Sequence, residues 1–552
     1  MRRLTALLLT VAFLTAACGG GGDSASSSSS GANAGSSSSS GDGKPVVGGK
    51  LVYGLEAETA GGFCLPEAQL AISGIQVAKS VYETLAAPNE KGDYVPYLAK
   101  SITPNATNTE WTIVLRDGVK FHDGTALDAT VVKNNLDSYR GKYPNRSPLL
   151  FVFVFDNIAD VAVVDPTSVK VTTKTPWPAF PAYLYGSGRI GMLAQSQLDD
   201  KTSCDKSLVG TGPFKSNGPI ANTQDITLVK NPTYWQKDAD GVQLPYLDEI
   251  EFRAIPDDAS RLNALQSKQL DMMHTDVPQV IVQLEPLVSD GSLSMTVNDE
   301  QGETAYVMFN QGRAPFDSQV ARDAVTLAFN TEQYNQVQNN GLLSEAGGPF
   351  PPGNSGFLDN TGKQKFNLEA AKAKVAQYKQ DTGQDLSFTL STTDEPVTIQ
   401  GAQLFQQFMK DAGMTVSLAH TNQPQLINQA IAGEFQAAGW RNHPGGDPDG
   451  QYVWWHTGSP VNFGRITDPE LDKLLEDGRV SSDDAARTKI YEDVNKLFAA
   501  KNYNMWQFLV KWAVASQPTV QGIYGPDLPD GGGAPAKGLG SGHPTLGIYV
   551  SK

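Results

Sequence analysis

Cysteine and histidine are the scarcest residues in this sequence, with three cysteines and six histidines among 552 residues. The histidines form no H-E-x-x-H motif or other ligand pair at helical spacing, and no G-x-S-x-G motif occurs. These absences argue against a zinc hydrolase and against a serine hydrolase. We therefore expect a protein that is not an enzyme and that uses no cofactor and no metal.

Positive charge and long apolar runs are also scarce. The chain has 43 Lys and Arg against 59 Asp and Glu, a formal net charge of −16, with no dense basic patch, which argues against a nucleic-acid partner. Beyond residue 17 no apolar stretch approaches the about 20 residues that span a bilayer. The rest has the composition of a globular protein and is longer than one core usually accommodates, so we expect two or three lobes.

The start of the sequence has the pattern of a targeting segment. Two arginines, an apolar run over 4–14 and two alanines predict a signal peptide over 1–17. Cys18 follows directly and resembles the cysteine of the bacterial lipobox, which is acylated and becomes the mature N-terminus. Leu14 lies four residues before Cys18, whereas the strictest form of that pattern has leucine three residues before. An ordinary secretory signal followed by a spare thiol is the alternative.

After Cys18 the chain reads first as a linker and then as a folded body. From 19 to 43 it is almost wholly Gly, Ser, Ala and Asn, so residues 18–44 are predicted to be a lipidated cysteine with a flexible tether. The other two cysteines, Cys64 and Cys204, would lie outside the cytoplasm, where two thiols in one chain often pair. We hypothesise a disulfide between them, with two buried free cysteines as the alternative.

Strand and helix patterns alternate along the body, which predicts a mixed α/β fold. Alternating apolar residues predict strands over 48–58 and 111–115, and a helix capped near Asp128 follows. Apolar residues at helical spacing predict further helices over 317–330, 368–383, 400–413 and 485–502. No sequence period typical of a solenoid repeats.

Three aromatic and turn-forming motifs carry a family resemblance. Residues 111–124 match W-x-[IVF]-x-L-R-x-G-V-x-F-x-D-G, residues 210–214 read G-T-G-P-F, and residues 231–235 read N-P-T-Y-W. In this order and spacing they resemble the dipeptide, oligopeptide and nickel type of solute-binding protein that serves ABC importers, called family 5. The resemblance covers nearly all of the body, from residue 48 to the end.

The resemblance implies an α/β, two-lobed periplasmic-binding-protein fold of the class II, flytrap type, with the additional family-5 domain. Carried over in order, domain I would take 45–87, 205–299 and 515–552, domain II would take 88–204, and domain III would take 300–514. The 111–124 signature then lies in domain II, where we expect it to maintain the fold and not to contact ligand.

Family ligands bind between the lobes, which selects several candidate residues. The loop after the first strand contributes Glu58, Gly62 and Phe63. Asn310 closes an apolar strand, where its amide could serve a peptide-like backbone, and a turn cap is the alternative. Trp440 follows a glycine at the end of another strand, where it could form an aromatic wall, and an ordinary core tryptophan is the alternative.

The sequence departs from the dipeptide binders of the family after Trp440. Those proteins carry an acid three residues before an Asp-Pro-Asp, which pairs with the ammonium of the peptide, and here that position is Pro444. Asp447 and Asp449 are candidate substitutes for this acid. Arg441 could instead favour a carboxylate or another anion.

The resemblance implies a substrate-binding lipoprotein of an ABC importer. It would capture a peptide or peptide-like solute outside the membrane and deliver it to the permease and its ATPase subunits. We expect a monomer, anchored by its lipid to the outer face of the cytoplasmic membrane. An oligosaccharide, opine or metal chelate is the alternative solute, and a tethered extracellular hydrolase is a remote alternative.

Overall fold

A computed structural model describes residues 44–56, 62–68, 70–220, 225–298, 302–442 and 445–551. The chain divides into two units, Met1–Lys44 and Pro45–Lys552, and we describe the second. The predictions of a signal peptide, of lipidation at Cys18 and of a ligand contact by Glu58 lie outside the described residues.

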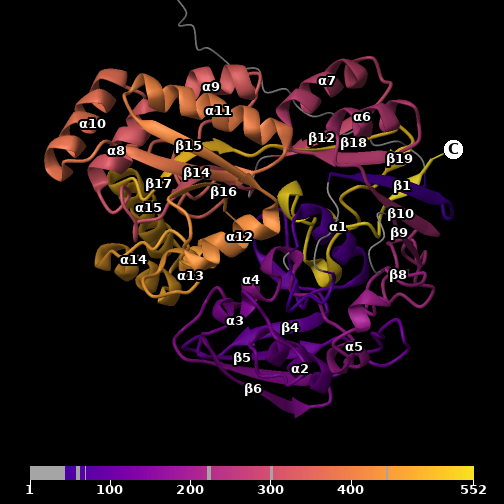
Figure 1. The fold of residues 1–552 in the computed structure, drawn as a ribbon. Helices are drawn as coiled ribbons and strands as arrows, with labels where there is room; N and C mark the ends of the chain where they lie inside the picture. The colour runs from indigo at the N-terminus through magenta and orange to yellow at the C-terminus, as the bar shows by residue number, and fades with distance from the viewer. Residues whose placement is uncertain are drawn as a thin grey trace, which may run out of the picture. The chain divides into compact units, whose positions relative to one another are not determined.

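A seven-stranded sheet collects segments from both ends and the middle of the chain (Figure 1). Its strand order is β12-β18-β11-β1-β10-β9-β8, and β1 runs parallel to both β10 and β11. Helix α1 covers one face, and α6 and α7 cover the other. The elements are β1 (Lys50–Leu55), α1 (Ile72–Val81), β8 (Phe214–Ser216), β9 (Asp225–Lys230), β10 (Glu249–Ala254), α6 (Asp258–Gln266), β11 (Met272–Thr275), α7 (Pro278–Ser289), β12 (Ser294–Asn298) and β18 (Trp512–Ser516).

A four-stranded antiparallel sheet, β4-β5-β7-β6, packs on the same core. One cluster of buried side chains contains Leu51 and Phe252 of the larger sheet together with Trp111 and Val171 of the smaller one, so the two sheets form a single first lobe. Its elements are β2 (Ala86–Pro88), β3 (Tyr94–Pro96), β4 (Ala99–Pro104), β5 (Glu110–Leu115), α2 (Ala129–Tyr139), α3 (Phe151–Val154), β6 (Ile158–Asp165), β7 (Ser168–Thr173), α4 (Phe180–Tyr183) and α5 (Gln195–Asp199).

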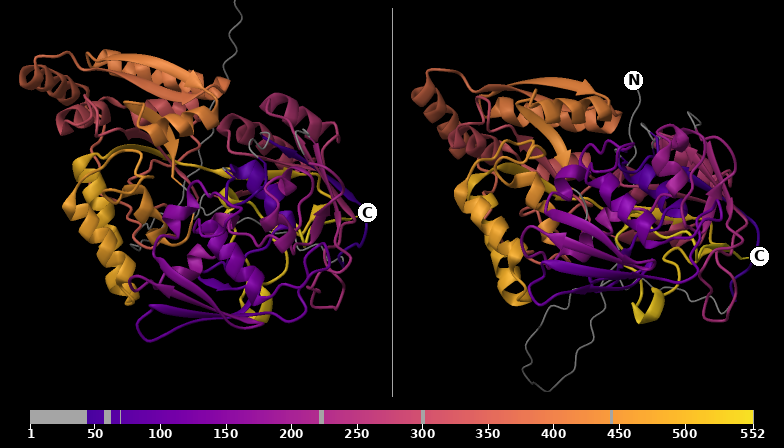
Figure 2. Two further views of the ribbon diagram at one scale, coloured as in Figure 1. Left: turned by 60° about the horizontal axis from the view of Figure 1, so that its bottom comes forward. Right: turned by 90° about the horizontal axis from the view of Figure 1, so that it is seen from below.

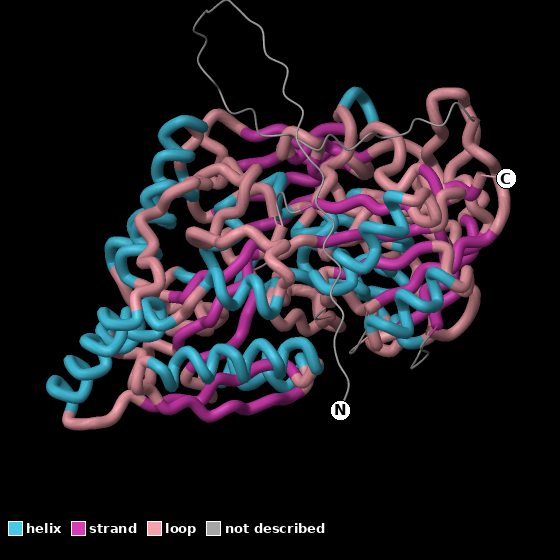
Figure 3. Tube along the Cα trace, turned by 90° about the horizontal axis from the view of Figure 1, so that it is seen from above, coloured by secondary structure: helices cyan, strands magenta, loops and turns pink. Residues whose placement is uncertain are grey.

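The second lobe is built on a five-stranded sheet with the order β15-β14-β16-β13-β17. Helices α8–α11 pack on one face and α12–α15 on the other, each set with its own buried cluster (Figures 1 and 3). The elements are β13 (Thr304–Phe309), α8 (Gln319–Ala328), α9 (Thr331–Gln338), α10 (Leu368–Thr382), β14 (Ser387–Thr393), α11 (Pro396–Asp411), β15 (Thr415–Thr421), α12 (Gln423–Ala432), β16 (Ala437–Arg441), α13 (Tyr452–Trp455), α14 (Pro469–Val480), α15 (Asp484–Lys501) and β17 (Asn504–Leu509).

The chain passes between the lobes from β12 to β13 and again from β17 to β18. The two crossings touch, because the Val510 amide donates to the Glu303 carbonyl oxygen over 2.9 Å. Figure 2 shows the purple strands of the first lobe separate from the orange strands of the second. The seven-stranded sheet takes its strands from 50–298 and 512–516, the four-stranded sheet from 99–173 and the five-stranded sheet from 304–509. The domain boundaries expected from the sequence stay a prediction.

Local signals in the sequence explain several element ends. Asp128 caps α2, since its carboxylate accepts from the amides of Thr130 and Val131 at 2.9 Å each. Gly383 ends α10 in the left-handed conformation, with φ of 74°, which glycine adopts without strain. Short elements complete the body: η1 (Gly186–Gly188), η2 (Ser203–Asp205), η3 (Pro448–Gln451), η4 (Pro529–Gly531), η5 (Leu539–Ser541), β19 (Val520–Gln521) and β20 (Tyr549–Val550).

The signature motif of 111–124 lies in the first lobe, where its residues pack and form turns. Trp111 and Phe121 are buried. Asp123 accepts from the Thr125 amide at 3.0 Å and from the Ser196 hydroxyl at 2.9 Å. Of the described helices, none combines the length and apolar character needed to cross a membrane.

Candidate ligand-binding site

Two carboxylates lie at one edge of the seven-stranded sheet, at the ends of neighbouring parallel strands. Glu56 follows β1, and Asp276 follows β11, which pairs with β1 in parallel. The carboxyl ends of parallel strands are the usual place for ligands in α/β proteins. The Glu56 amide donates to Nε2 of His274 over 3.2 Å, which fixes the backbone at this edge.

Strand β16 of the second lobe brings a guanidinium to the same place. β16 ends at Arg441, which pairs across the sheet with Ala305, so Glu303 at the lobe crossing lies beside it. Arg441 Nη1 forms ion pairs with Asp276 and, at 3.5 Å, with Glu303 Oε2. The Arg441 to Asp276 pair therefore joins the two lobes. We call the group of Glu56, Asp276, Glu303 and Arg441 the charged recess.

Protein atoms surround the charged recess, but its arginine side chain is partly accessible to solvent. Burial raises the pKa of Glu56 well above its ordinary value; Asp276 raises it further, and Arg261 and Arg441 oppose the rise. Burial also raises the pKa of Glu303, against the pull of Arg441. For Arg441 burial lowers the pKa, but the three carboxylates together raise it above its ordinary value. Since 46% of the Arg441 side chain is accessible, a solute can reach the guanidinium.

Trp512 and Arg189 lie near Glu303 of the charged recess. Trp512 is buried and donates from Nε1 to Glu303 Oε2 over 3.3 Å. Arg189 donates from Nε and Nη2 to the Leu70 carbonyl oxygen at 3.1 and 3.0 Å. Burial lowers the pKa of Arg189 to about 10, and nearby Glu303 opposes that shift. Trp440 precedes Arg441 on β16 and therefore faces the other side of the sheet, where its ring centroid lies 5.7 Å from that of Phe463, so it is not part of the charged recess.

Asn310 has the contacts of a turn cap. Its Nδ2 donates to the carbonyl oxygens of Gly433 at 3.1 Å and Phe435 at 2.9 Å, and its Oδ1 accepts from the Gly312 amide at 3.1 Å. The side chain is 1% exposed. These contacts do not support a ligand-binding role, so we do not include Asn310 in the proposed site.

The two aspartates of the Asp-Pro-Asp turn also have protein partners. Asp447 forms an ion pair with Arg487 and accepts from the Asp449 amide at 2.9 Å. Asp449 is fully buried and accepts from Trp177 Nε1 at 2.8 Å, from the Tyr183 hydroxyl at 2.9 Å and from Arg479 Nε at 3.0 Å. Because Asp449 has no accessible surface and Asp447 is paired with both Nη atoms of Arg487, the structure does not support either as the anchor of an ammonium group.

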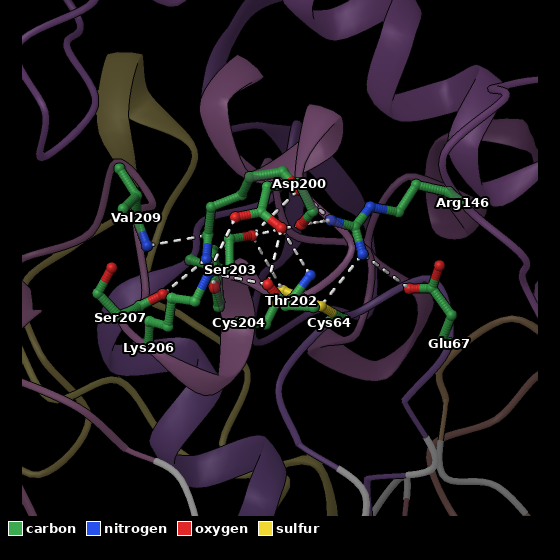
Figure 4. Close-up of a disulfide and its surroundings, with 12 residues drawn as sticks. Cys64, Glu67, Arg146, Asp200, Thr202, Ser203, Cys204, Lys206, Ser207 and Val209 are labelled. Atoms are coloured by element: carbon green, nitrogen blue, oxygen red, sulfur yellow. Dashed lines mark hydrogen bonds and ion pairs between the residues drawn. A yellow bond between two sulfur atoms is a disulfide. The ribbon is translucent and has the colours of Figure 1, made fainter.

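The loop after β1 packs into the first lobe where it is described. Phe63 is 3% exposed and belongs to the large core cluster, and Gly62 has φ of 75°. Beside them the structure pairs Cys64 with Cys204, 140 residues apart (Figure 4). Arg146 supports the bridge by donating to Cys64 Sγ over 3.1 Å. Phe63 is therefore a core residue, and we do not include it in the proposed site.

Sequence reasoning missed Glu56, Asp276 and Glu303. Each acid stands directly after or before a strand, which the sequence shows. Their convergence depends on which strands are neighbours, which it does not show. Within the ranges that the structure describes, no three His, Cys, Asp or Glu side chains are placed to hold a metal ion.

Comparison with known families decides what kind of protein carries this site. The family model described as "Bacterial extracellular solute-binding proteins, family 5 Middle" matches residues 93–464. The chain belongs to this family. Its two-lobed α/β architecture is that of the family's solved members, which confirms both the family and the fold expected from the sequence motifs.

Individual relatives of this family 5 protein bind chemically different solutes. A nickel-binding periplasmic protein of Escherichia coli (strain K12) is 24% identical over 434 residues, covering 75% of this chain and 80% of the relative. AgaA from A. tumefaciens R10, solved with agropinic acid, has a TM-score of 0.79 at 23% identity, with 91% and 99% of the two chains covered. DppA from Helicobacter pylori, solved with the peptide STSA, has a TM-score of 0.79 at 21% identity, with 92% and 99% covered.

Proposed function

We propose that this family 5 protein captures a small solute between its two lobes outside the cytoplasm and delivers it to an ABC permease. The charged recess is the observation that carries the proposal, because Arg441 of the second lobe meets Asp276 of the first there. A solute bound at this point contacts both lobes and stabilises their closed arrangement, the flytrap form of hinge closure. ATP would be hydrolysed by the subunits that accompany the permease.

We propose that the solute is a peptide or a peptide-like zwitterion. Glu56, Asp276 and Glu303 supply acceptors for an ammonium group, and they outnumber the one guanidinium among them. The accessible Arg441 supplies a planar donor for a carboxylate. Asp276 and Glu303 thus offer the acid that the dipeptide binders carry at the position of Pro444 here.

An opine or a metal chelate is the second candidate solute. AgaA was solved with agropinic acid, and the E. coli relative is a nickel-binding protein. An arginine whose side chain is 46% accessible suits a ligand with several carboxylates as well as a peptide. We propose further that the chain acts as a monomer, is not an enzyme, and is held at the outer face of the cytoplasmic membrane by lipid on Cys18.

A thermal-shift screen of the unlipidated chain tests the proposed function. The panel contains di- to pentapeptides, opines, nickel chelates and oligosaccharides. A solute at about a hundredfold excess over Kd adds about 2.7 kcal/mol to the free energy of unfolding, which appears as a clear rise in Tm. Peptide hits support the zwitterion proposal, and hits among opines or chelates alone replace it with the second candidate. No hit in any class would contradict a solute-binding role.

A further inference from the structure

A cavity lies mainly within the first lobe, and none of the functions proposed above uses it. It is lined by the end of α1 with Lys79 and Glu83, by the 94–97 and 185–188 segments, and by residues 526–546 near the C-terminus. Gly445 and Gly446 of the second lobe also line it. We call this cavity the tyrosine chamber, since four tyrosines line it: Tyr82, Tyr94, Tyr97 and Tyr185.

Each of the four tyrosine hydroxyls already has a protein partner, so what they offer a ligand is ring surface. The hydrogen bonds are Tyr82 to Gln197 Oε1 at 2.8 Å, Lys79 Nζ to Tyr185 at 3.1 Å, the Gly446 amide to Tyr94 at 3.0 Å, and Gln236 Nε2 to Tyr97 at 2.7 Å. Proline rings complete the walls, at Pro88, Pro213, Pro526, Pro535 and Pro544.

Three charged side chains line the chamber: Lys79 and Glu83 are likewise held by the protein, and Asp527 is exposed to solvent. Lys79 also donates to the Gly542 carbonyl oxygen over 2.9 Å. Glu83 is buried and accepts from the Tyr234 hydroxyl at 2.6 Å and from Trp235 Nε1 at 3.0 Å. Away from Asp527, a charged or strongly polar ligand group would lose its hydration here with little in return, whereas an apolar group gains by leaving water.

Residues near the charged recess and residues of the chamber are close together in the chain. Tyr185 lines the chamber, and Arg189, four residues later, lies close enough to Tyr185 and to Glu303 to be influenced by both. Gly445 lines the chamber four residues after Arg441, and four residues span at most about 14 Å. The Cα atoms of Arg441 and Gly445 are therefore at most about 14 Å apart, a separation that one solute can span.

We infer that the tyrosine chamber receives an apolar, preferably aromatic, group of the same solute whose charged groups bind at the recess. This inference rests on the proposed function and narrows its substrate class to amphipathic solutes. The Gly446 to Tyr94 hydrogen bond joins the two lobes, so the chamber is complete only when the lobes have closed.

Filling the chamber tests this inference. Ala536 lines the chamber, whereas Ala534, two residues earlier, does not, so Ala536→Phe and Ala534→Phe form a matched pair. The first probe is indole, titrated into the full unlipidated chain and followed by ligand-observed NMR. We expect Ala536→Phe to weaken indole binding at least fivefold and Ala534→Phe to leave it within twofold. Ala87→Leu is a second filling variant, in case Ala536→Phe lowers Tm.

The second probe is a pair of dipeptides, Gly-Phe and Gly-Ala, titrated by calorimetry. We expect wild type to bind Gly-Phe at least tenfold more tightly, about 1.4 kcal/mol, and the filled chamber to remove that preference. If both dipeptides bind equally, or if the preference survives filling, the chamber inference is wrong and solute capture at the recess stands. If no dipeptide binds, the peptide proposal fails, and indole still decides whether the chamber takes an apolar group.

Discussion

Removing the Asp449 carboxylate should destabilise the protein without touching its solute. Asp449 is fully buried, and three donors converge on it, from Trp177 and Tyr183 of the first lobe and Arg479 of the second. The Arg479 side chain is 10% accessible, so Asp449→Ala leaves a guanidinium buried without its counter-charge. Breaking a buried pair in this way lowers stability by about 3–5 kcal/mol.

The assay is urea denaturation followed by tryptophan fluorescence, with Asp477→Ala as the control. Asp477 pairs with Lys473 at the surface of the same helix as Arg479, and an exposed pair of this kind contributes about 0.3–0.5 kcal/mol. The double variant Asp449→Ala with Arg479→Met should regain most of the loss, because no unpaired charge remains. A loss of stability below 1 kcal/mol for Asp449→Ala would refute this reasoning. Unchanged stability together with abolished solute binding would refute it as well and would identify Asp449 as a ligand-binding residue.

Three further predictions concern the cysteines and one histidine. A chain that begins after Cys18 should show no free thiol before reduction and two afterwards. The double variant Cys64→Ser with Cys204→Ser should be about 2–5 kcal/mol less stable than wild type. Two free thiols in the oxidised protein would contradict the disulfide. Burial lowers the pKa of His543 to about 4 from an ordinary 6.5, so the unfolded chain binds more protons between these values. Stability should therefore fall by about 3 kcal/mol more in wild type than in His543→Gln as the pH drops from 6.5 to 4, and identical pH profiles would refute this. In cell fractionation, Cys18→Ser should move the protein from the membrane to the soluble fraction, and an unchanged distribution would exclude lipid as the anchor.

Local sequence patterns were enough to predict some of the strands and helices, and the family. The alternation of Trp111, Ile113 and Leu115 gave β5, and the carboxylate of Asp128 marked the start of α2. Such signals act between near neighbours in the chain, where side-chain spacing and capping decide the conformation. The motifs of 111–124, 210–214 and 231–235 then identified the fold, because they belong to a known family.

The candidate site was harder to predict because its contacts join distant parts of the chain. Asp449 lies in an acidic turn near Trp440, and the sequence therefore suggested a ligand-binding role. The sequence does not show that its hydrogen-bond partner is Trp177, which is 272 residues away. Glu56 and Asp276 meet because β1 and β11 are parallel neighbours, which follows from the sheet order and not from either segment. Arg441, by contrast, was predicted as a site residue and stays in the proposed site.

The central claim is that the solute binds between the lobes at Arg441. It is tested most directly by calorimetric titration of the strongest solute from the thermal-shift panel into wild type, Arg441→Gln and Arg313→Gln. Arg313 is an exposed arginine of the second lobe that serves as the control. A hydrogen bond to a charged group contributes about 1.5–3 kcal/mol, so Arg441→Gln should weaken binding about 10- to 100-fold and Arg313→Gln less than twofold. Equal affinity for wild type and Arg441→Gln would contradict the account and place the solute elsewhere.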